Sequence, residues 1–148
     1  MIHAAAPSSV PPRVLYRIMR LRCEVFVVEQ ACAYLDLDGR DVEDGAVLVW
    51  ADPDPSAPTV AATARVLVEG SAGGRRIGRV ATAPAWRRQG LAAAVVDHAL
   101  ALCGDAPVVL DAQAHVVGWY ERRGFERAGP EFDEDGIAHV PMRRRPPG

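Results

Sequence analysis

The sequence predicts an α+β fold (α/β in the broad sense), with a mixed, mostly antiparallel central sheet and helices on both faces. Three observations support this prediction. A helical segment comes first, three short strands then follow one another closely, and the second half alternates helix and strand before a final hairpin. The 148 residues can bury one sizeable core but not two, so we expect a single domain over residues 1–148.

The first half of the chain predicts one helix and a three-stranded meander. Residues 13–26 carry apolar side chains at helical spacing, namely Val14, Ile18, Leu21 and Val25. Strands rich in apolar and β-branched residues follow at residues 46–51, 59–68 and 76–82. Their short connections favour antiparallel pairing. No convincing strand precedes Val14, so residues 1–6 either pair weakly at the sheet edge or form no strand.

The second half predicts alternating helices and strands. A helix is expected over residues 90–103, a nearly all-apolar strand of the buried parallel type over residues 108–112, and a short helix over residues 115–123. Gly124 is a typical stop for that helix. Residues 125–132 and 137–144 then predict a hairpin across residues 133–136.

Composition excludes several classes of function. The net charge is −2, which disfavours a nonspecific nucleic-acid partner, and all 17 basic residues are Arg, which excludes a Schiff-base or P-loop lysine. No apolar run reaches the roughly 20 residues of a membrane span, and the N-terminal residues lack the features of a signal peptide. Cys23, Cys32 and Cys103 match no common zinc pattern, so we expect reduced, buried or half-buried thiols, no metal and a cytoplasmic protein.

The most informative segment runs from residue 80 to residue 92, where a strand ends, a proline-containing turn follows and a glycine-containing loop opens a helix. The start of a helix offers unpaired N–H groups and a positive dipole end, which suit a pyrophosphate. Gly90 permits close approach of the backbone, Ala92 is small, and Arg87 and Arg88 add positive charge. Taken alone, the same residues also fit a solvated arginine turn before a surface helix.

Two segments carry a family resemblance. Residues 87–92 (Arg-Arg-Gln-Gly-Leu-Ala) resemble the Q/R-x-x-G-x-G/A signature of the GNAT superfamily of N-acetyltransferases. Residues 113–125 resemble its N-x-x-A-x-x-x-Y-x-x-x-G-F segment. Within the superfamily, residues 21–30, 112–115 and 134–142 are similar to the ElaA-like branch.

The resemblance implies a GNAT fold with a β-α-β-α cofactor-binding core and acetyl-CoA as co-substrate. Backbone groups of the strand residues Val80, Ala81 and Thr82 would bind the pantetheine arm, and the strands at 76–82 and 108–112 would splay apart to admit it. The pyrophosphate would lie on the loop residues Arg87, Arg88, Gln89, Gly90, Leu91 and Ala92. Gln113 stands where the superfamily usually has Asn, so that contact with the cofactor would differ in reach.

Two residues are candidates for catalysis under this resemblance. Tyr120 can donate a proton to the departing thiolate of coenzyme A, although in isolation it also reads as an aromatic core residue. Glu29 can accept the proton that an ammonium acceptor must lose, or it can simply tie down its loop. His115 and His139 are alternatives for the base. The partner would be a small-molecule or peptide amine, with no nucleic acid or membrane involved, and a homodimer is plausible.

The acidic stretch and the cysteines allow other interpretations of the sequence. The acidic stretch at residues 36–45 does not fit a calcium loop because Gly39 falls at the fourth position and not the sixth, so a solvated loop, or one that attracts a cationic acceptor, is expected. The cysteines form no Cys-His-Asn grouping, which favours direct transfer in a ternary complex over an acetyl-cysteine intermediate. An acyl-CoA sensor without turnover is the alternative to an enzyme.

Overall fold

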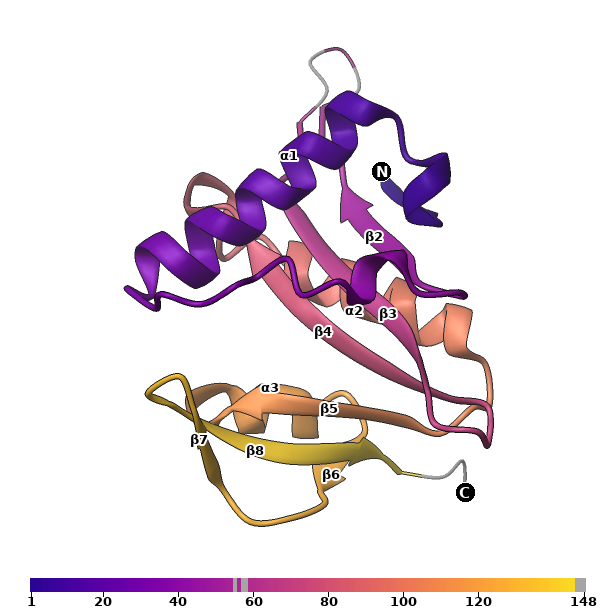
Figure 1. Ribbon diagram of the computed structural model, residues 1–148, viewed down its shortest axis with the longest axis vertical. Coiled ribbons are helices and arrows are strands. Elements are labelled where there is room, and N and C mark those ends of the chain that lie inside the picture. Colours follow the sequence, from indigo (N-terminus) through magenta and orange to yellow (C-terminus); the bar gives the residue numbers. More distant parts are fainter. Residues whose placement is uncertain (55, 57–58, 146–148) are drawn as a thin grey trace.

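The computed structural model describes residues 1–54, 56 and 59–145, and a single sheet runs through its whole length (Figure 1). Within these residues the strand order is β1-β2-β3-β4-β5-β8-β6, and β7 pairs with β8. The strands are β1 (Ile2–Ala5), β2 (Val47–Ala51), β3 (Ala62–Glu69), β4 (Gly74–Thr82), β5 (Val108–Gln113), β6 (Phe125–Arg127), β7 (Phe132–Glu134) and β8 (Ile137–Arg144). The helices are α1 (Pro12–Cys23), the π-helix η2 (Glu24–Glu29), α2 (Leu91–Cys103) and α3 (Val117–Glu121), with 3₁₀ turns η1 (Pro7–Ser9), η3 (Arg40–Val42), η4 (Pro84–Trp86) and η5 (Ala114–Val116).

The first four strands form the antiparallel half of the sheet. β2, β3 and β4 pair in succession, which confirms the predicted meander. β1 adds a fourth strand at the edge, from Ile2 opposite Ala51 to Ala5 opposite Leu48. The question left open for the N-terminal residues is therefore answered, because an edge strand does precede α1.

The two halves of the sheet meet in one short parallel pair. β4 and β5 are paired only at Arg75 with Val108 and at Arg76 with Val109. Beyond these residues β4 continues to Thr82 and β5 to Gln113 without pairing to each other, and Figure 1 shows them diverging. The predicted splay is confirmed, and β5 pairs on its other side with β8, antiparallel.

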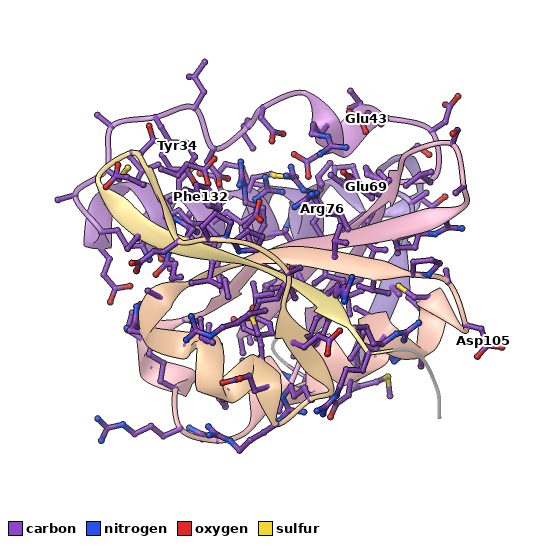
Figure 2. The ribbon with its side chains drawn as sticks, turned by 90° about the horizontal axis from the view of Figure 1, so that it is seen from below. Tyr34, Glu43, Glu69, Arg76, Asp105 and Phe132 are labelled. Carbon is purple, nitrogen blue, oxygen red and sulfur yellow. The ribbon has the colours of Figure 1, made fainter. Side chains whose placement is uncertain are left out.

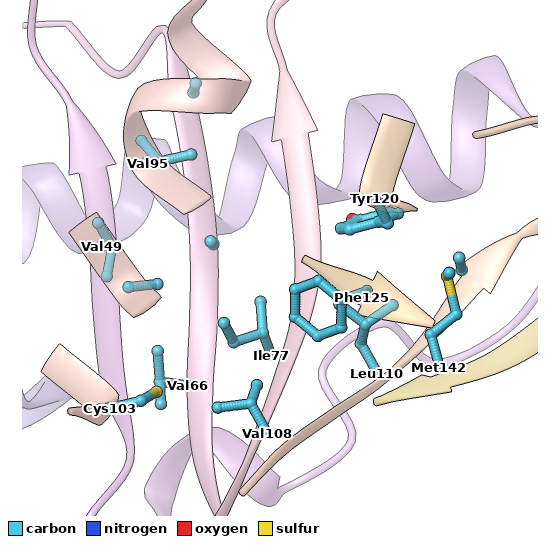
Figure 3. Packing of buried hydrophobic residues seen from close by; sticks show 14 of the residues in the cluster. Val49, Val66, Ile77, Val95, Cys103, Val108, Leu110, Tyr120, Phe125 and Met142 are labelled. Atoms are coloured by element: carbon cyan, nitrogen blue, oxygen red, sulfur yellow. The ribbon is translucent and has the colours of Figure 1, made fainter. Parts of the chain in front are cut away.

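Helices cover both faces of the sheet, as predicted (Figure 1). On one face α1 packs its Ile18 and Leu21 against Leu48 of β2. On the other face α2 and α3 contribute residues such as Val95 and Tyr120 to the larger core, and most of its other members come from the strands. Figure 3 shows this cluster, which also includes Val49, Val66, Ile77, Cys103, Val108, Leu110, Phe125 and Met142. Since neighbouring residues of a strand point to opposite faces, Leu48 and Val49 serve different cores.

Several predicted boundaries were wrong. The first helix does not end at residue 26, because η2 continues it to Glu29 with wider turns, in which the N–H of Gln30 donates to the carbonyl of Val25. The second meander strand begins at Ala62 and not at residue 59. The strand expected over residues 125–132 is split into β6 and β7, and the turn after β7 is the two-residue Asp135-Gly136, both with positive φ, as a type I′ hairpin requires.

Candidate active site

The loop between β4 and α2 is exposed and leaves the start of the helix uncovered. Turn η4 leads from the strand into residues 87–90, all of which are exposed. Gly90 has φ +77° and stands immediately before Leu91, the first residue of α2. No side chain of the described chain caps this end of the helix. The N–H groups of the first turn therefore point toward solvent without a partner of their own helix, and an anion can accept from them.

The side chains of this loop divide into two kinds. Leu91 packs against the larger core, and Ala92 is half-buried, so both belong to the framework. Arg88 and Gln89 are exposed, and no ion pair joins Arg88 to any carboxylate in the part of the chain that the structure describes. Arg88 also has φ +64°, a left-handed conformation that is costly for a residue with a Cβ. The guanidinium of Arg88 is therefore available to bind a phosphate group, and its backbone conformation is strained.

The end of β4 is irregular where the cofactor is expected. The pairing with β3 shifts between Thr63 and Arg65, so that Arg79 and Val80 lie opposite the single residue Ala64. This arrangement is a β-bulge, which interrupts the ladder and re-aims the strand. Val80 packs against the larger core and Ala81 is buried in the smaller one, while the Thr82 carbonyl accepts a hydrogen bond from Nε of Arg87 at 3.2 Å.

Upstream of this bulge the two diverging strands are still tied together. Figure 2 shows Arg76 beside Glu69, and its Nε donates to Glu69 at 3.0 Å while its Nη1 donates to Asp111 of β5 at 3.1 Å. The splay thus begins immediately past an ion pair that spans both strands. Toward β5, the backbone of β4 beyond Arg76 has no strand partner.

Glu29 and Arg87, which the sequence assigned to different tasks, contact each other directly. Arg87 Nη1 and Nη2 donate to the two carboxylate oxygens of Glu29 at 2.6 and 2.5 Å, a bidentate pair. About two-fifths of each side chain stays exposed, 40% for Arg87 and 42% for Glu29. The hydrogen bond from Arg87 lowers the pKa of Glu29. A carboxylate held in this way is a weak base until the guanidinium leaves it.

A second contact joins the end of η2 to the end of β5. The side-chain amides of Gln30 and Gln113 hydrogen-bond to each other reciprocally, at 3.4 and 3.3 Å. The Sγ of Cys32, two residues further along, lies 3.4 Å from the carbonyl of Asp135 in the β7–β8 turn. The segment after η2 therefore connects α1 to the C-terminal half of the sheet. Sequence reasoning overlooked Gln30, although it lies in a stretch already singled out.

Tyr120 lies in the core, and its hydroxyl has no hydrogen-bond partner among the described residues. Its ring packs edge-on against Trp119, at 4.9 Å between centroids. It also packs edge-on against Phe125, at 5.9 Å (Figure 3). Burial raises the pKa of Tyr120 to about 12, so the phenol stays protonated at neutral pH. Within the described residues the hydroxyl makes no hydrogen bond, and no hydrogen bond or ion pair joins it to Glu29. Both sequence interpretations of Tyr120, core residue and proton donor, are compatible with this position.

The histidines considered as alternative bases occupy different environments. His115 is exposed in the turn that follows β5. His139 of β8 lies 2.8 Å from the Ile137 carbonyl through Nδ1 and stacks on Phe132 at 5.7 Å. Neither histidine contacts Glu29 or Tyr120 through a hydrogen bond within the described chain.

The acidic loop is solvated only in part: most of its residues are exposed, but two of its carboxylates are buried, contrary to the prediction. Asp36 and Asp41 are buried, and Asp36 is only 3% exposed. Their carboxylates are partners of arginines from three separate elements. We call this set the arginine–aspartate network; its members are Arg22, Arg65, Arg79, Asp36, Asp38 and Asp41. Since the three negative charges of this network are matched by three positive ones, these three aspartates offer little free charge to attract a cationic acceptor.

Arg22 is the centre of this network. Its guanidinium, 1% exposed, donates to Asp36 at 2.9 Å and to the two oxygens of Asp41 at 2.7 and 3.1 Å. Arg65 of β3 binds Asp38 at 2.9 and 3.1 Å and reaches Asp41 at 3.3 Å. The sequence does carry one signal of the burial of Arg22. Arg22 lies four residues after Ile18, so it falls on the apolar stripe of α1, where a charged residue needs a buried partner.

The comparisons with known proteins agree with the geometry. The profile of the family described as an acetyltransferase (GNAT) domain matches residues 56–146, more than half of the chain. The chain belongs to the GNAT family. It is 36% identical over 137 residues to protein ElaA of Escherichia coli, covering 88% of this chain and 86% of ElaA, and thus falls in the ElaA-like branch. It is 45% identical over 135 residues to a UPF0039 protein of Mycobacterium tuberculosis, covering 89% of this chain and 85% of that protein.

Solved structures show the same GNAT fold. The crystal structure of an acyl-CoA N-acyltransferase from Pseudomonas aeruginosa superposes with a TM-score of 0.89 at 35% identity, covering 98% of this chain and 99% of that one. The crystal structure of E. coli ElaA superposes with a TM-score of 0.86 at 32% identity, over 98% of this chain and 99% of that chain. Among the described residues no helix is long and apolar enough to cross a membrane, and no group of three His, Cys, Asp or Glu side chains is placed to hold a metal.

Proposed function

We propose that this GNAT protein is an acetyl-CoA-dependent N-acetyltransferase that transfers the acetyl group directly to an amine in a ternary complex. The observation that carries the proposal is the uncapped start of α2 beside a strand whose edge is unpaired. Helix N–H groups suit a pyrophosphate, and an open strand edge suits the amide groups of a pantetheine arm. Membership of the GNAT family and the likeness to the P. aeruginosa acyl-CoA N-acyltransferase support it.

The residues of the loop fit coenzyme A. Arg88 would bind a phosphate group, and the amides from Arg88 to Ala92 would bind the pyrophosphate. The backbone at Val80, Ala81 and Thr82 would hold the pantetheine arm. Where the arm needs the Thr82 carbonyl as an acceptor, Arg87, which donates to that carbonyl in the free protein, would have to release it. Gln113, in its pair with Gln30, would lie at the far side of the splay. Bound acetyl-CoA supplies the thioester from which the amine takes the acetyl group.

Tyr120 would supply the proton for the leaving group. The thiolate of coenzyme A needs a proton or a hydrogen bond as the carbon–sulfur bond breaks. A phenol with a pKa of about 12 is protonated at neutral pH and can donate. Its hydroxyl has no other partner among the described residues, so donation to sulfur breaks no existing hydrogen bond.

Glu29 would serve as the base once Arg87 has left it. In the free protein the bidentate pair keeps the pKa of Glu29 low, which opposes proton uptake. A phosphate group that draws Arg87 away would restore the ordinary basicity of the carboxylate. Binding of the cofactor would thereby make Glu29 able to take a proton from the acceptor. The acceptor would be a small-molecule or peptide amine.

Direct transfer is preferred over an acetyl-cysteine route because the two buried thiols, Cys32 and Cys103, are poor nucleophiles. All three cysteines are free, and Cys32 and Cys103 are buried. Burial raises the pKa of both thiols, which keeps them protonated and unreactive at neutral pH. Free thiols also support a cytoplasmic location.

The test is a panel of amines incubated with acetyl-CoA, with released thiol measured for the wild type and for Tyr120→Phe. We expect turnover with at least one amine, and a loss in kcat of about a hundredfold or more for the variant, with coenzyme A binding retained. No thiol release with any amine, together with unchanged cofactor binding in Tyr120→Phe, would identify an acyl-CoA sensor and contradict the enzyme.

A further inference from the structure

The bulge on β4 stands in a conformation that its own sequence does not favour. Arg79 has φ +52°, in the left-handed region that residues with a Cβ rarely adopt. Arg79 and Val80 together face Ala64, so the ladder with β3 is interrupted there. A residue kept in this region needs surrounding contacts that hold it.

Those contacts come from the Arg79 side chain. Its Nε lies 2.8 Å from Oδ1 of Asp36, at an angle that makes the contact electrostatic and not a hydrogen bond. Its Nη2 donates to Asp38 at 3.2 Å and to the Asp36 carbonyl at 3.2 Å. The guanidinium also stands over the ring of Tyr34, 5.6 Å from the centroid.

These partners are themselves fixed from other elements. Asp36 accepts from Arg22 of α1 at 2.9 Å and from the Tyr34 hydroxyl at 3.0 Å. Asp38 accepts from Arg65 of β3 through two hydrogen bonds. The residues that Arg79 contacts are thus anchored to α1 and β3, and they can resist movement of the bulge. The network therefore links α1 and β3 to one point on β4.

We propose that Arg79 is a positioning residue, which holds the bulge so that the backbone after it, from Val80 to Thr82, is presented to the pantetheine arm. The inference rests on the proposed use of acetyl-CoA. Arg79 itself faces the acidic loop and touches no reacting atom. Without its anchor the bulge is free to leave this backbone conformation, and the donors and acceptors on the open edge of β4 shift.

The experiment distinguishes binding of the pantetheine arm from binding of the nucleotide half of the cofactor. Calorimetric titration of the full chain with coenzyme A is compared with titration by 3′-phosphoadenosine 5′-diphosphate, which has the nucleotide and pyrophosphate but no pantetheine. For Arg79→Ala we expect the Kd of coenzyme A to rise about tenfold, the effect of losing one or two backbone hydrogen bonds, while the Kd of the nucleotide stays within about twofold of the wild type. Arg75→Ala is the matched control, because Arg75 lies on the same strand and, among the described residues, its side chain hydrogen-bonds only to the carbonyls of Gly73 and Gly74.

A second readout is independent of any ligand. Hydrogen exchange of the peptide from residue 78 to residue 82 should be faster in Arg79→Ala than in the wild type and unchanged in Arg75→Ala. If the alanine variant does not fold, Arg79→Gln keeps a shorter polar side chain without the charge and should also weaken binding of coenzyme A but not of the nucleotide.

Each other outcome overturns the inference. Equal weakening of both ligands would mean that Arg79 stabilises the fold in general, and unchanged binding of coenzyme A would mean that the bulge needs no anchor. If the wild type binds neither ligand, the proposed function itself fails. Binding by the wild type without a selective loss in Arg79→Ala leaves that function intact and rejects only the role of Arg79.

Discussion

Two sets of arginine–carboxylate pairs differ in what surrounds them. In the arginine–aspartate network, Arg22 is 1% exposed, and each of its carboxylate partners also contacts another arginine. The pair of Glu29 with Arg87 is bidentate and short, but it is exposed and each side chain has only the other as an ionic partner in the described chain. The first set cannot lose a member without leaving a charge buried. The second can exchange a partner for a ligand at little cost.

The largest effect is expected from removing Arg22. In Arg22→Ala, Asp36 and Asp41 lose hydrogen bonds and a compensating charge while they stay buried. Breaking a buried pair in this way lowers the free energy of unfolding by about 3–5 kcal/mol. Urea denaturation followed by circular dichroism measures it.

A control for this prediction lies in the same helix. Arg20 forms a solvent-exposed pair with Glu24, so Arg20→Ala should leave the urea midpoint almost unchanged. Similar losses for both variants would contradict the distinction between buried and exposed pairs.

A smaller effect is expected on the stability of the protein at acidic pH. Burial opposes ionisation of Asp38, but hydrogen bonds from Arg65 and from the backbone of Arg40 outweigh it and lower the pKa of Asp38 to about 2. A carboxyl whose pKa is lower in the folded state stabilises the protein above the unfolded pKa, near 4, and loses this contribution as the pH falls toward 2. The urea midpoint should therefore fall between pH 4 and pH 2. In Asp38→Asn that fall should be shallower, and an identical pH profile would show that the ion pair adds nothing.

The smallest effect is expected at the exposed pair, where the sign is informative. Glu29→Gln removes the competitor for Arg87, so coenzyme A should bind up to about fivefold more tightly, the most that an exposed ion pair contributes. Arg87→Gln should weaken binding, although it breaks the same pair. Titration calorimetry measures both constants. Weaker binding in both variants would mean that the pair only shapes the loop.

The sequence predicted the layers of the fold because they depend on periodicity. Apolar side chains at helical spacing in α1 and α2, and compact apolar runs in β2 and β5, indicate their elements locally. β1 was left open because its Ile-His-Ala-Ala has weak strand preference, and its pairing with β2 is what makes it a strand. The bulge at Arg79 has the same origin, since it exists only in the register between β3 and β4.

The candidate site was predictable to the extent that it follows motifs. The motifs single out the loop before α2 and Tyr120, and their roles stay predictions: the start of α2 has no side-chain cap, and burial keeps the Tyr120 phenol protonated at neutral pH. The contact of Glu29 with Arg87, 58 residues apart in sequence, was not predictable from either motif. The burial of Asp36 and Asp41 was also missed, because aspartates in a glycine-containing loop are usually exposed and only the arginines of other elements reverse that expectation.

The π-helix η2 has more residues in each turn than the α-helix α1 that it continues. Each of its turns holds about one residue more than an α-turn, so η2 is equivalent to an insertion within a regular helix. Deleting one residue between Cys23 and Glu29 would restore regular winding and leave the carboxylate on nearly the same side of the helix, because an α-turn holds about one residue fewer. If the six residues of η2 wound as a regular α-helix with none deleted, the carboxylate would turn about the helix axis by roughly 100° and would no longer face Arg87. In relatives of this chain, a gap of one residue at this place is therefore compatible with a glutamate that keeps its arginine partner.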